Sequence, residues 1–304
     1  MKIAHISDLH LLALEGNSPR RFLNKRFTGW VNLRYRRKAI HKPDVARAVA
    51  RELREREIDH VVITGDVTNL ALESEFELVR RYLEHDLGFE PSRVSMVPGN
   101  HDVYTQGSRI ARRFQCYLGE YITTDLPDAT SVPDVGRFPY VRLRGPVAFI
   151  GLCSAVPRPL LVASGRLGPV QRAALHALLG HDEVRRRLPV ILQHHPFHNP
   201  PKRLKRYMNG LEDAAEEHRV LQGVERGLLL HGHLHRRVKQ RISTEEGHID
   251  AVGSTSASLL DPRHERMGGF NVYDVADDGR LASVETFRLE PETGDFVPAG
   301  FARA

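Results

Sequence analysis

Five short stretches of the 304-residue chain carry aspartate, asparagine or histidine, and each follows an apolar run. Carboxylate, amide and imidazole groups bind divalent metals such as zinc, manganese and iron. The stretches are Asp8-Leu9-His10, Asp66, Asn100-His101-Asp102, His194-His195, and His231 to His235. Residues of this kind, spread along the chain, indicate a metal site whose ligands come together only when the chain folds.

The apolar runs before these residues predict the elements that must position them. The clearest run, His-Val-Val-Ile at 60–63, is followed by Thr64, Gly65 and Asp66. Because the run is short, β-branched and closed by a glycine that permits a sharp turn, we predict a buried strand there. Similar runs cover residues 2–7, 94–97, 189–193 and 228–230. We therefore expect five strand ends to deliver the candidate ligands.

Helical patterns alternate with the first strands. Proline or acidic residues open apolar-periodic segments at 43–57 and 73–87, and further helices are predicted at 108–118, 169–179 and 211–221. Beyond residue 235 the chain turns to strands, at 238–243, 248–252, 269–275 and 281–288. Alternating strands and helices favour a parallel sheet covered by helices. We therefore predict an α/β fold, a four-layer αββα sandwich of two mixed sheets with outer helices.

Composition and charge exclude several classes of protein. The longest apolar region, 147–165, contains two prolines and Arg158, so we predict no transmembrane span. Two cysteines, Cys116 and Cys153, do not form a disulfide framework, and the first residues lack an export signal, so we expect a cytoplasmic protein. The net charge of +6 favours an anionic partner. We expect one catalytic domain over 1–290, because the metal-type residues must converge, and a C-terminal tail at 291–304.

A basic amphipathic insertion is predicted at 13–43. From residue 11 to 43 one acid, Glu15, stands against nine lysines and arginines. Helical spacing of apolar residues gives this segment a stripe, made of Leu23, Phe27, Trp30 and Val31. Such a segment either contacts an anionic membrane or ligand, or packs its stripe on the core and solvates its charges. Both interpretations stay open.

The five stretches, taken in order, resemble the signature of the calcineurin-like metallophosphoesterase superfamily. That signature is DxH, GD, GNH followed by an acid, an isolated histidine, and GHxH. The matching blocks here are Asp8-Leu9-His10, Gly65-Asp66, Gly99-Asn100-His101-Asp102, His194, and Gly232-His233-Leu234-His235. All five occur in the family's order between residues 8 and 235. The resemblance implies two divalent cations, manganese, iron or zinc, bound at one centre.

Ligand roles follow from the resemblance. One metal would be held by Asp8, His10, Asp66 and His235, and the other by Asp66, Asn100, His194 and His233. The family's His-x-Pro pattern selects His194 rather than His195. A bridging carboxylate such as Asp66 holds two cations about 3.5–4 Å apart, where both contact one phosphate.

The resemblance also implies residues that act beside the metals. His101 would face the leaving group as general acid or electrostatic stabiliser, with Asp102 orienting it. A second basic cluster follows the fourth block, and both basic segments leave strand ends that carry metal ligands. Candidates for substrate contact are His195, Arg34, Lys202 and Arg203.

The implied activity is hydrolysis of phosphodiester or diphosphate bonds by in-line attack of metal-bound hydroxide. The GNHD and His-His-Pro blocks resemble class III cyclic-nucleotide phosphodiesterases. The basic insertion instead resembles bacterial enzymes that cleave the diphosphate of UDP-2,3-diacylglucosamine at the inner membrane surface. We therefore expect a phosphorylated anionic substrate, nucleotide-like or lipid-linked, with peripheral membrane contact through residues 20–42 in the second case. A nuclease, favoured by charge, and a non-catalytic scaffold, which would have lost ligands, are the alternatives.

Overall fold

The computed structural model describes residues 1–14, 41–127 and 136–302, and within them the chain forms two six-stranded sheets. The strands of the first sheet are β1 (Lys2–Ile6), β2 (His60–Ile63), β3 (Val94–Met96), β10 (Gly269–Val275), β11 (Leu281–Leu289) and β12 (Phe296–Pro298). Their order is β12-β11-β10-β1-β2-β3. Strands β1, β2 and β3 are parallel, whereas β10 to β12 add antiparallel neighbours. The sheet is therefore mixed, and its parallel part carries the first three predicted ligand-bearing ends.

The second sheet is also mixed. Its strands are β4 (Tyr140–Arg144), β5 (Val147–Gly151), β6 (Leu188–Leu192), β7 (Arg226–His231), β8 (Val238–Ser243) and β9 (His248–Gly253). Their order is β4-β5-β6-β7-β9-β8, with β5, β6, β7 and β9 parallel. The strands β4 and β8 pair antiparallel at the two edges.

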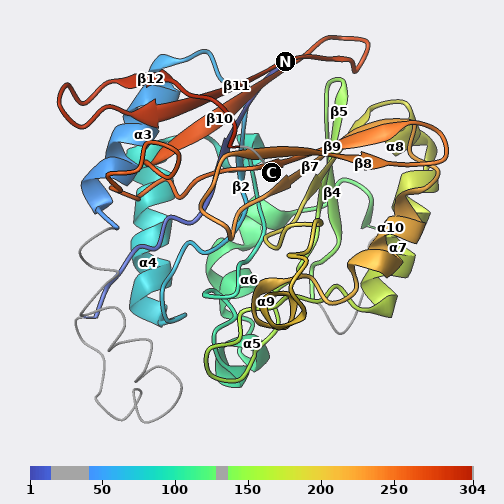
Figure 1. The fold of residues 1–304 in the computed structure, drawn as a ribbon, viewed down its shortest axis with the longest axis horizontal. Coiled ribbons are helices and arrows are strands. Elements are labelled where there is room, and N and C mark those ends of the chain that lie inside the picture. Colours follow the sequence, from blue (N-terminus) through green and yellow to red (C-terminus); the bar gives the residue numbers. More distant parts are fainter. Residues whose placement is uncertain (15–40, 128–135, 303–304) are drawn as a thin grey trace.

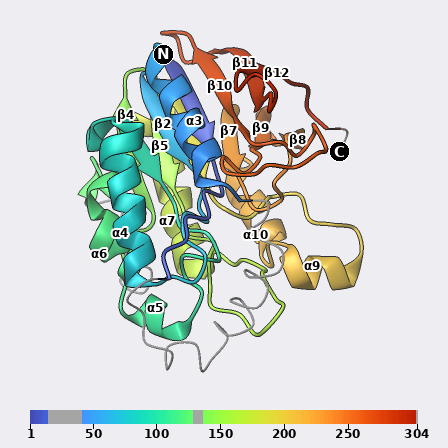
Figure 2. The same cartoon turned by 90° about the vertical axis from the view of Figure 1, so that its left-hand side faces the viewer.

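Helices cover the outer faces of the two sheets (Figures 1 and 2). On the first sheet lie α3 (Pro43–Glu55) and α4 (Glu73–Arg81), and α4 runs on into a π-helix at Tyr82–Leu87. On the second sheet lie α7 (Pro169–Gly180) and α10 (Ala214–Leu221). The shorter helices are α5 (Gln106–Ile110), α6 (Arg113–Leu118), α8 (Asp182–Arg185) and α9 (Arg203–Asn209). The α/β fold of two mixed sheets with outer helices, predicted from the sequence, is confirmed.

Side chains on the parallel strands of the second sheet alternate between two hydrophobic cores. Phe149 and Leu228 belong to the larger core, which also contains residues of the first sheet. Their neighbours Ile150 and Leu229 belong to a second core, with residues of α7 and α10. Because successive side chains of a strand point to opposite faces, a strand buried on both faces must be apolar throughout. This explains the continuous apolar runs that the sequence shows at these strands.

Three elements differ from the sequence-based expectation. The helix expected at 108–118 is divided into α5 and α6, because Arg112 between them has a left-handed backbone (φ 46). The helix expected at 43–57 ends two residues earlier, at Glu55. The expected tail at 291–304 is in part a strand, since β12 pairs with β11 and Phe296 packs on the core. The first sheet therefore extends beyond residue 290.

The predicted basic insertion falls mostly outside the described residues. Its stripe and Arg34 lie within 15–40, whereas its final residues, His41 to Pro43, lead into α3. Among the described residues, no helix has the length and hydrophobicity needed to cross a bilayer.

Glu217 on α10 gives the fold a testable pH dependence. Its side chain is fully buried, and burial, together with Asp213, raises its pKa from 4.5 to about 8. The folded protein therefore keeps a proton that the unfolded chain releases above about pH 4.5, so this group lowers the free energy of unfolding as pH rises to about 8. Glu217→Gln should remove that loss, on the order of a few kcal/mol.

Urea unfolding at pH 5, 7 and 9 measures this effect. Glu216→Gln is the matched control, because Glu216 precedes Glu217 on the same helix and its side chain is 43% exposed. The Glu217→Gln variant and the wild type should differ most at pH 9. A constant difference across the three pH values would contradict the assigned pKa.

Candidate metal centre

The carboxyl ends of parallel strands from both sheets meet at one edge of the sandwich. Each of five strands is followed by predicted ligands: β1 by Asp8 and His10, β2 by Asp66, β3 by Asn100, β6 by His194, and β7 by His233 and His235. Residues 225 positions apart, such as His10 and His235, lie in direct contact there. The seven predicted ligands are therefore brought together, which neither sheet could do alone.

Four of these residues form a first cluster, which we call site A (Asp8, His10, Asp66, His235). His235 Nε2 lies 3.0 Å from Asp8 Oδ1 and 3.3 Å from His10 Nε2. His10 Nε2 lies 3.8 Å from Asp8 Oδ1 and 3.9 Å from Asp66 Oδ2. Asp8, His10 and Asp66 are buried, so these atoms face one another away from bulk water.

A second cluster, site B (Asp66, Asn100, His194, His233), adjoins the first. His194 Nε2 lies 3.3 Å from Asp66 Oδ2 and 3.1 Å from Asn100 Oδ1. His233 Nδ1 lies 3.2 Å from His194 Nε2 and 3.1 Å from Asn100 Oδ1. The same oxygen, Asp66 Oδ2, thus belongs to both clusters, which would let this carboxylate bridge two metal ions.

These separations fit two divalent cations. A metal with bonds of about 2.1 Å in tetrahedral geometry holds its ligand atoms about 3.4 Å apart, and the measured separations run from 3.0 to 3.9 Å. Lone pairs on nitrogen and oxygen that face each other in a buried site repel unless a proton or a cation lies between them. The donor set, imidazole, carboxylate and amide oxygen, suits borderline metals such as zinc, iron and manganese.

Neighbouring groups fix the orientation of the candidate ligands. His194 Nδ1 lies 2.8 Å from the carbonyl of Thr64 and donates to it, which leaves Nε2 as the ligand atom. The hydroxyl of Ser256 donates to the carbonyl of Asp8 at 2.6 Å, and the Asn69 amide donates to the carbonyl of His10 at 2.6 Å. Support of this kind is typical of metal ligands.

The family is decided by sequence comparison. The model of the calcineurin-like phosphoesterase family matches residues 1–237, the part of the chain that holds every predicted ligand. The chain belongs to the calcineurin-like phosphoesterase family. None of the curated proteins compared with it matches in sequence.

Solved structures share the fold of this phosphoesterase at low sequence identity. A dimetal phosphatase from Danio rerio is 15% identical, with a TM-score of 0.57 over 90% of this chain and 91% of that one. The purple acid phosphatase PPD1 from yellow lupin (Lupinus luteus) seeds is 12% identical, with a TM-score of 0.57 over 98% of this chain. The match covers 52% of the lupin chain, so the phosphoesterase spans about half of that protein's length.

The backbone of the phosphoesterase is strained at most of the candidate ligands. Left-handed φ angles occur at five of the seven: Asp8 (53), His10 (46), Asp66 (51), His233 (67) and His235 (49). Residues with side chains adopt this conformation rarely, although aspartate and histidine tolerate it better than most. Such strain is concentrated at functional sites, where surrounding contacts must compensate for it. The packing of the two sheets thus stabilises ligand geometry that an isolated loop would not keep.

Two glycines of the signature blocks allow close approach to the carboxylates. A side chain at Gly99 would collide with the Asp66 carboxylate, and one at Gly232 with Asp8 and Ser7. Glycine at these positions is therefore required by space around the metal site rather than by chain flexibility.

Electrostatics tie the two clusters together. Burial opposes ionisation of Asp66, yet His194 and His101 hold the pKa of that carboxyl well below its usual range. Burial likewise opposes protonation of His194, but Asp66 and Asp8 raise the pKa of its imidazole to about 9. The buried carboxylates of Asp8 and Asp66 thus stabilise positive charge between the two clusters, and metal ions also supply such charge.

His101 lies at the edge of the candidate metal site, and several contacts orient it. Its backbone N–H donates to Asp66 Oδ1 at 2.7 Å, and its ring Nδ1 donates to the carbonyl of Asn69 at 2.7 Å. The ring of Tyr104 stacks on it at 5.4 Å, a partner that the sequence did not reveal. Because a carbonyl can only accept, the Nδ1 atom of His101 carries a proton.

Asp102 is placed differently from the prediction. Its carboxylate accepts hydrogen bonds from the backbone N–H groups of Thr68 (2.8 Å) and Gly99 (2.9 Å) and from the Thr68 hydroxyl (2.8 Å). Burial and Asp66 raise the pKa of Asp102 to about 7, against these donors. Asn69, rather than Asp102, contacts the His101 ring. The Asp102 contacts instead join the loops after β2 and β3, which carry Asp66 and Asn100.

His195, a predicted substrate contact, is buried and does not line the groove next to His233. It is fully buried, with Nδ1 2.8 Å from the Ser154 hydroxyl and Nε2 donating to the carbonyl of Ala163 at 2.9 Å. Both ring nitrogens are engaged within the protein, and the ring packs 4.6 Å from that of His233. His195 thus packs against the candidate ligand His233.

A groove of about 670 Å³ opens over site B and is partly basic. Its floor includes Asp66, Asn100, His101, His233 and His235, and its outer walls include His198, Lys205, Gln240, Arg236 and Arg266. Lys202 and Arg203, the predicted substrate contacts, are exposed at the start of α9 and do not line this groove. Lys205, one turn further along α9, lines the groove instead. The sequence alone shows a cluster of basic residues but not which of them faces the groove.

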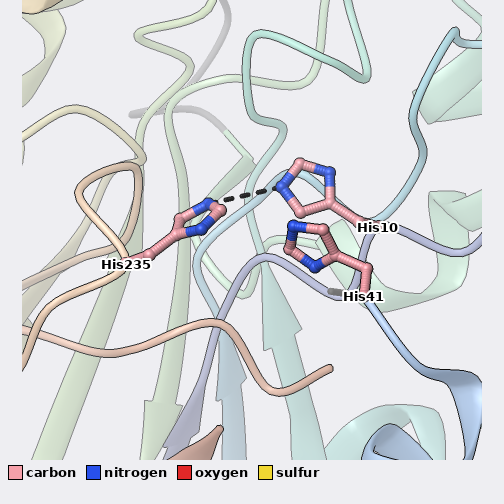
Figure 3. Close-up of side chains that lie close together, drawn as sticks. All are labelled: His10, His41 and His235. Carbon is pink, nitrogen blue, oxygen red and sulfur yellow. Dashed lines mark hydrogen bonds between the residues drawn. The ribbon is translucent and has the colours of Figure 1, made fainter. Parts of the chain in front are cut away.

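Sequence reasoning also missed His41. It lies beside His10 and His235, and the three rings converge in Figure 3. No signature block contains it, although a histidine two residues before the predicted helix start at Pro43 was a visible signal.

Proposed function

We propose that this phosphoesterase is a dimetal hydrolase that cleaves phosphodiester or diphosphate bonds. The observation that carries the proposal is the pair of ligand clusters that share Asp66 Oδ2 at the floor of a basic groove. Two divalent cations at sites A and B would polarise a phosphoryl group and supply hydroxide near neutral pH. Asp8 and Asp66 are the only carboxylates among the seven ligands, so two divalent ions leave the centre net positive, which attracts an anionic phosphate.

His101 is the proposed general acid. Its Nδ1–H bond to the Asn69 carbonyl orients the ring, so the imidazolium form would carry its second proton on Nε2, and the residue lines the groove. That proton would pass to the oxygen of the leaving group as the bond to phosphorus breaks. Hydrogen-bonded orientation by Asn69 and stacking by Tyr104 keep the ring in place for this transfer.

Groove size and charge support a substrate larger than inorganic phosphate. A volume of about 670 Å³ falls in the range of sites for nucleotide-sized ligands. Lys205, Arg236 and Arg266 on the outer walls would contact negative charge away from the reacting phosphorus. A nucleotide-like or lipid-linked diphosphate supplies such charge on both sides of the scissile bond.

Hydrolysis of a substrate panel tests the proposed bond type. Metal-stripped protein is supplied with manganese and assayed on bis-p-nitrophenyl phosphate, p-nitrophenyl phosphate, cyclic AMP, a UDP-linked lipid and single-stranded DNA. We expect kcat/KM for the diester or diphosphate substrates to exceed that for p-nitrophenyl phosphate. A preference for the monoester would contradict the proposed bond type, and no hydrolysis of any substrate would favour a scaffold.

Lys205→Ala tests the proposed substrate contact. It should raise KM for a nucleotide-sized diester or diphosphate about two- to fivefold, the effect of losing an exposed charge contact worth up to ~1 kcal/mol. KM for bis-p-nitrophenyl phosphate should not change, because that substrate carries no charge beyond its reacting group. Lys202→Ala is the matched control, since Lys202 is exposed three residues earlier and outside the groove. Equal effects of the two substitutions would contradict a role for Lys205 in binding.

We propose a cytoplasmic location and peripheral membrane contact through residues 20–42. The charge of that segment supports the contact, because each basic residue near an anionic surface contributes on the order of 1 kcal/mol. Sedimentation with anionic vesicles, for the wild type and for a variant neutral at Arg34, Arg36, Arg37 and Lys38, separates membrane contact from packing on the core.

A further inference from the structure

His41 is fixed at the point where the chain enters α3. Its backbone forms an antiparallel bridge with Leu259, and the next residue, Lys42, donates its N–H to the carbonyl of Ser258 at 2.8 Å. The side chain is largely buried, and its Nδ1 lies 2.8 Å from the Ser258 hydroxyl. Position and ring orientation are thus both determined by described residues.

The His41 ring faces two ligands of site A. Its centroid lies 4.4 Å from that of His10 and 5.5 Å from that of His235. One ring nitrogen from each of the three histidines lies within 4.8 Å of the others. Since Nδ1 of His41 is directed to Ser258, Nε2 is the nitrogen on the side of His10 and His235 (Figure 3).

Buried histidines elsewhere in this protein are satisfied differently. His5 places its two ring nitrogens against the hydroxyls of Tyr273 and Thr64, at 3.1 and 2.8 Å. His60 contacts the Ser95 hydroxyl at 2.9 Å and stacks on Phe149. His41 instead contacts the Ser258 hydroxyl through Nδ1, and the other side of its ring faces His10 and His235, which belong to site A. An outward hydroxyl partner at Nδ1 is the arrangement that orients a histidine ligand bound through Nε2.

We infer that His41 is a further nitrogen ligand of the metal at site A. This inference rests on the dimetal centre proposed above and adds a residue outside its seven ligands. Site A would then have three imidazoles and two carboxylates, whereas site B has two imidazoles, one carboxylate and one amide oxygen. Imidazole-rich sites favour zinc, cobalt and iron over manganese, so the two sites should differ in affinity for these metals.

Cobalt titration of metal-stripped protein tests the inference without relying on activity. Cobalt(II) reports its coordination through its visible absorption, and equilibrium dialysis gives the number and affinity of bound ions. Two variants are compared with the wild type: His41→Ala, and His41→Phe, which keeps a ring but offers no nitrogen. His176→Ala is the matched control, because His176 is exposed on α7. Thermal unfolding of the metal-free proteins checks that each variant is folded.

The wild type and His176→Ala should bind two cobalt ions. Each His41 variant should keep one site unchanged, lose at least about tenfold in affinity at the other, and change the absorption of that site. Two ions bound by the His41 variants with wild-type affinity and spectrum would overturn the inference and leave the dimetal proposal intact. Fewer than two ions in the wild type would overturn the dimetal proposal, and the role of His41 with it.

Discussion

Asp66→Ala should abolish hydrolysis and reduce bound metal from two ions per chain to one or none. Asp66 Oδ2 lies 3.9 Å from His10 Nε2 in site A and 3.3 Å from His194 Nε2 in site B, so one substitution removes a ligand from both. The other carboxylate oxygen accepts the backbone N–H of His101 at 2.7 Å, and its loss also releases the proposed general acid. Metal content by elemental analysis and turnover of bis-p-nitrophenyl phosphate measure both effects.

Asp59→Ala is the matched control for this substitution. Asp59 lies at the opposite end of the same strand, is exposed, and accepts a hydrogen bond from the backbone of Lys2. It should keep two metals and wild-type turnover. An Asp66→Ala protein with two tightly bound ions and intact activity would show that Asp66 is not the bridge.

His101→Ala should keep both metals and lose roughly 10² to 10⁴ in turnover, the range typical of a general acid. No ligand atom of site A or site B belongs to His101, so metal content should not change. The loss should be smaller for substrates with good leaving groups such as p-nitrophenolate, because these need little protonation as they depart.

A series of aryl diesters with leaving groups of different pKa measures this dependence. The slope of log kcat against leaving-group pKa should be steeper for His101→Ala than for the wild type. Parallel slopes would contradict proton donation by His101 and favour positioning of the phosphate instead.

Strand ends and their ligands were predictable because a local pattern determines both. A β-branched run such as 60–63, closed by Gly65, specifies a strand buried on both faces, and the five blocks place each ligand directly after such a run. Convergence of the ligands then follows from parallel pairing, since β1, β2 and β3 end at one edge of their sheet and β6 and β7 at the same edge of theirs.

Contacts between distant loops were not predictable from local patterns. His41 approaches His10 only because its backbone pairs with Leu259, a partner more than 200 residues away. Asn69, rather than the adjacent Asp102, orients His101, because the turn after β2 directs its carbonyl at the ring. Asp66, whose backbone is left-handed, likewise packs directly against Gly99, which belongs to a separate loop.

The same limit applies to the groove and the C-terminus. Lys202, Arg203 and Lys205 are equivalent as charges in the sequence, and only the orientation of α9 decides which of them lines the groove. Strand β12 is three residues long and gives too weak a pattern to predict, although it completes the first sheet.

Activity as a function of bound manganese tests the dimetal centre most directly. Metal-stripped wild-type protein is loaded with zero to three equivalents of manganese, and bound metal and hydrolysis of bis-p-nitrophenyl phosphate are measured on the same samples. Because the proposed reaction needs both clusters that share Asp66, hydrolysis should rise with occupancy of the second site and level off at two bound ions per chain. Full activity at one bound ion, or in protein without metal, would contradict a dimetal phosphohydrolase.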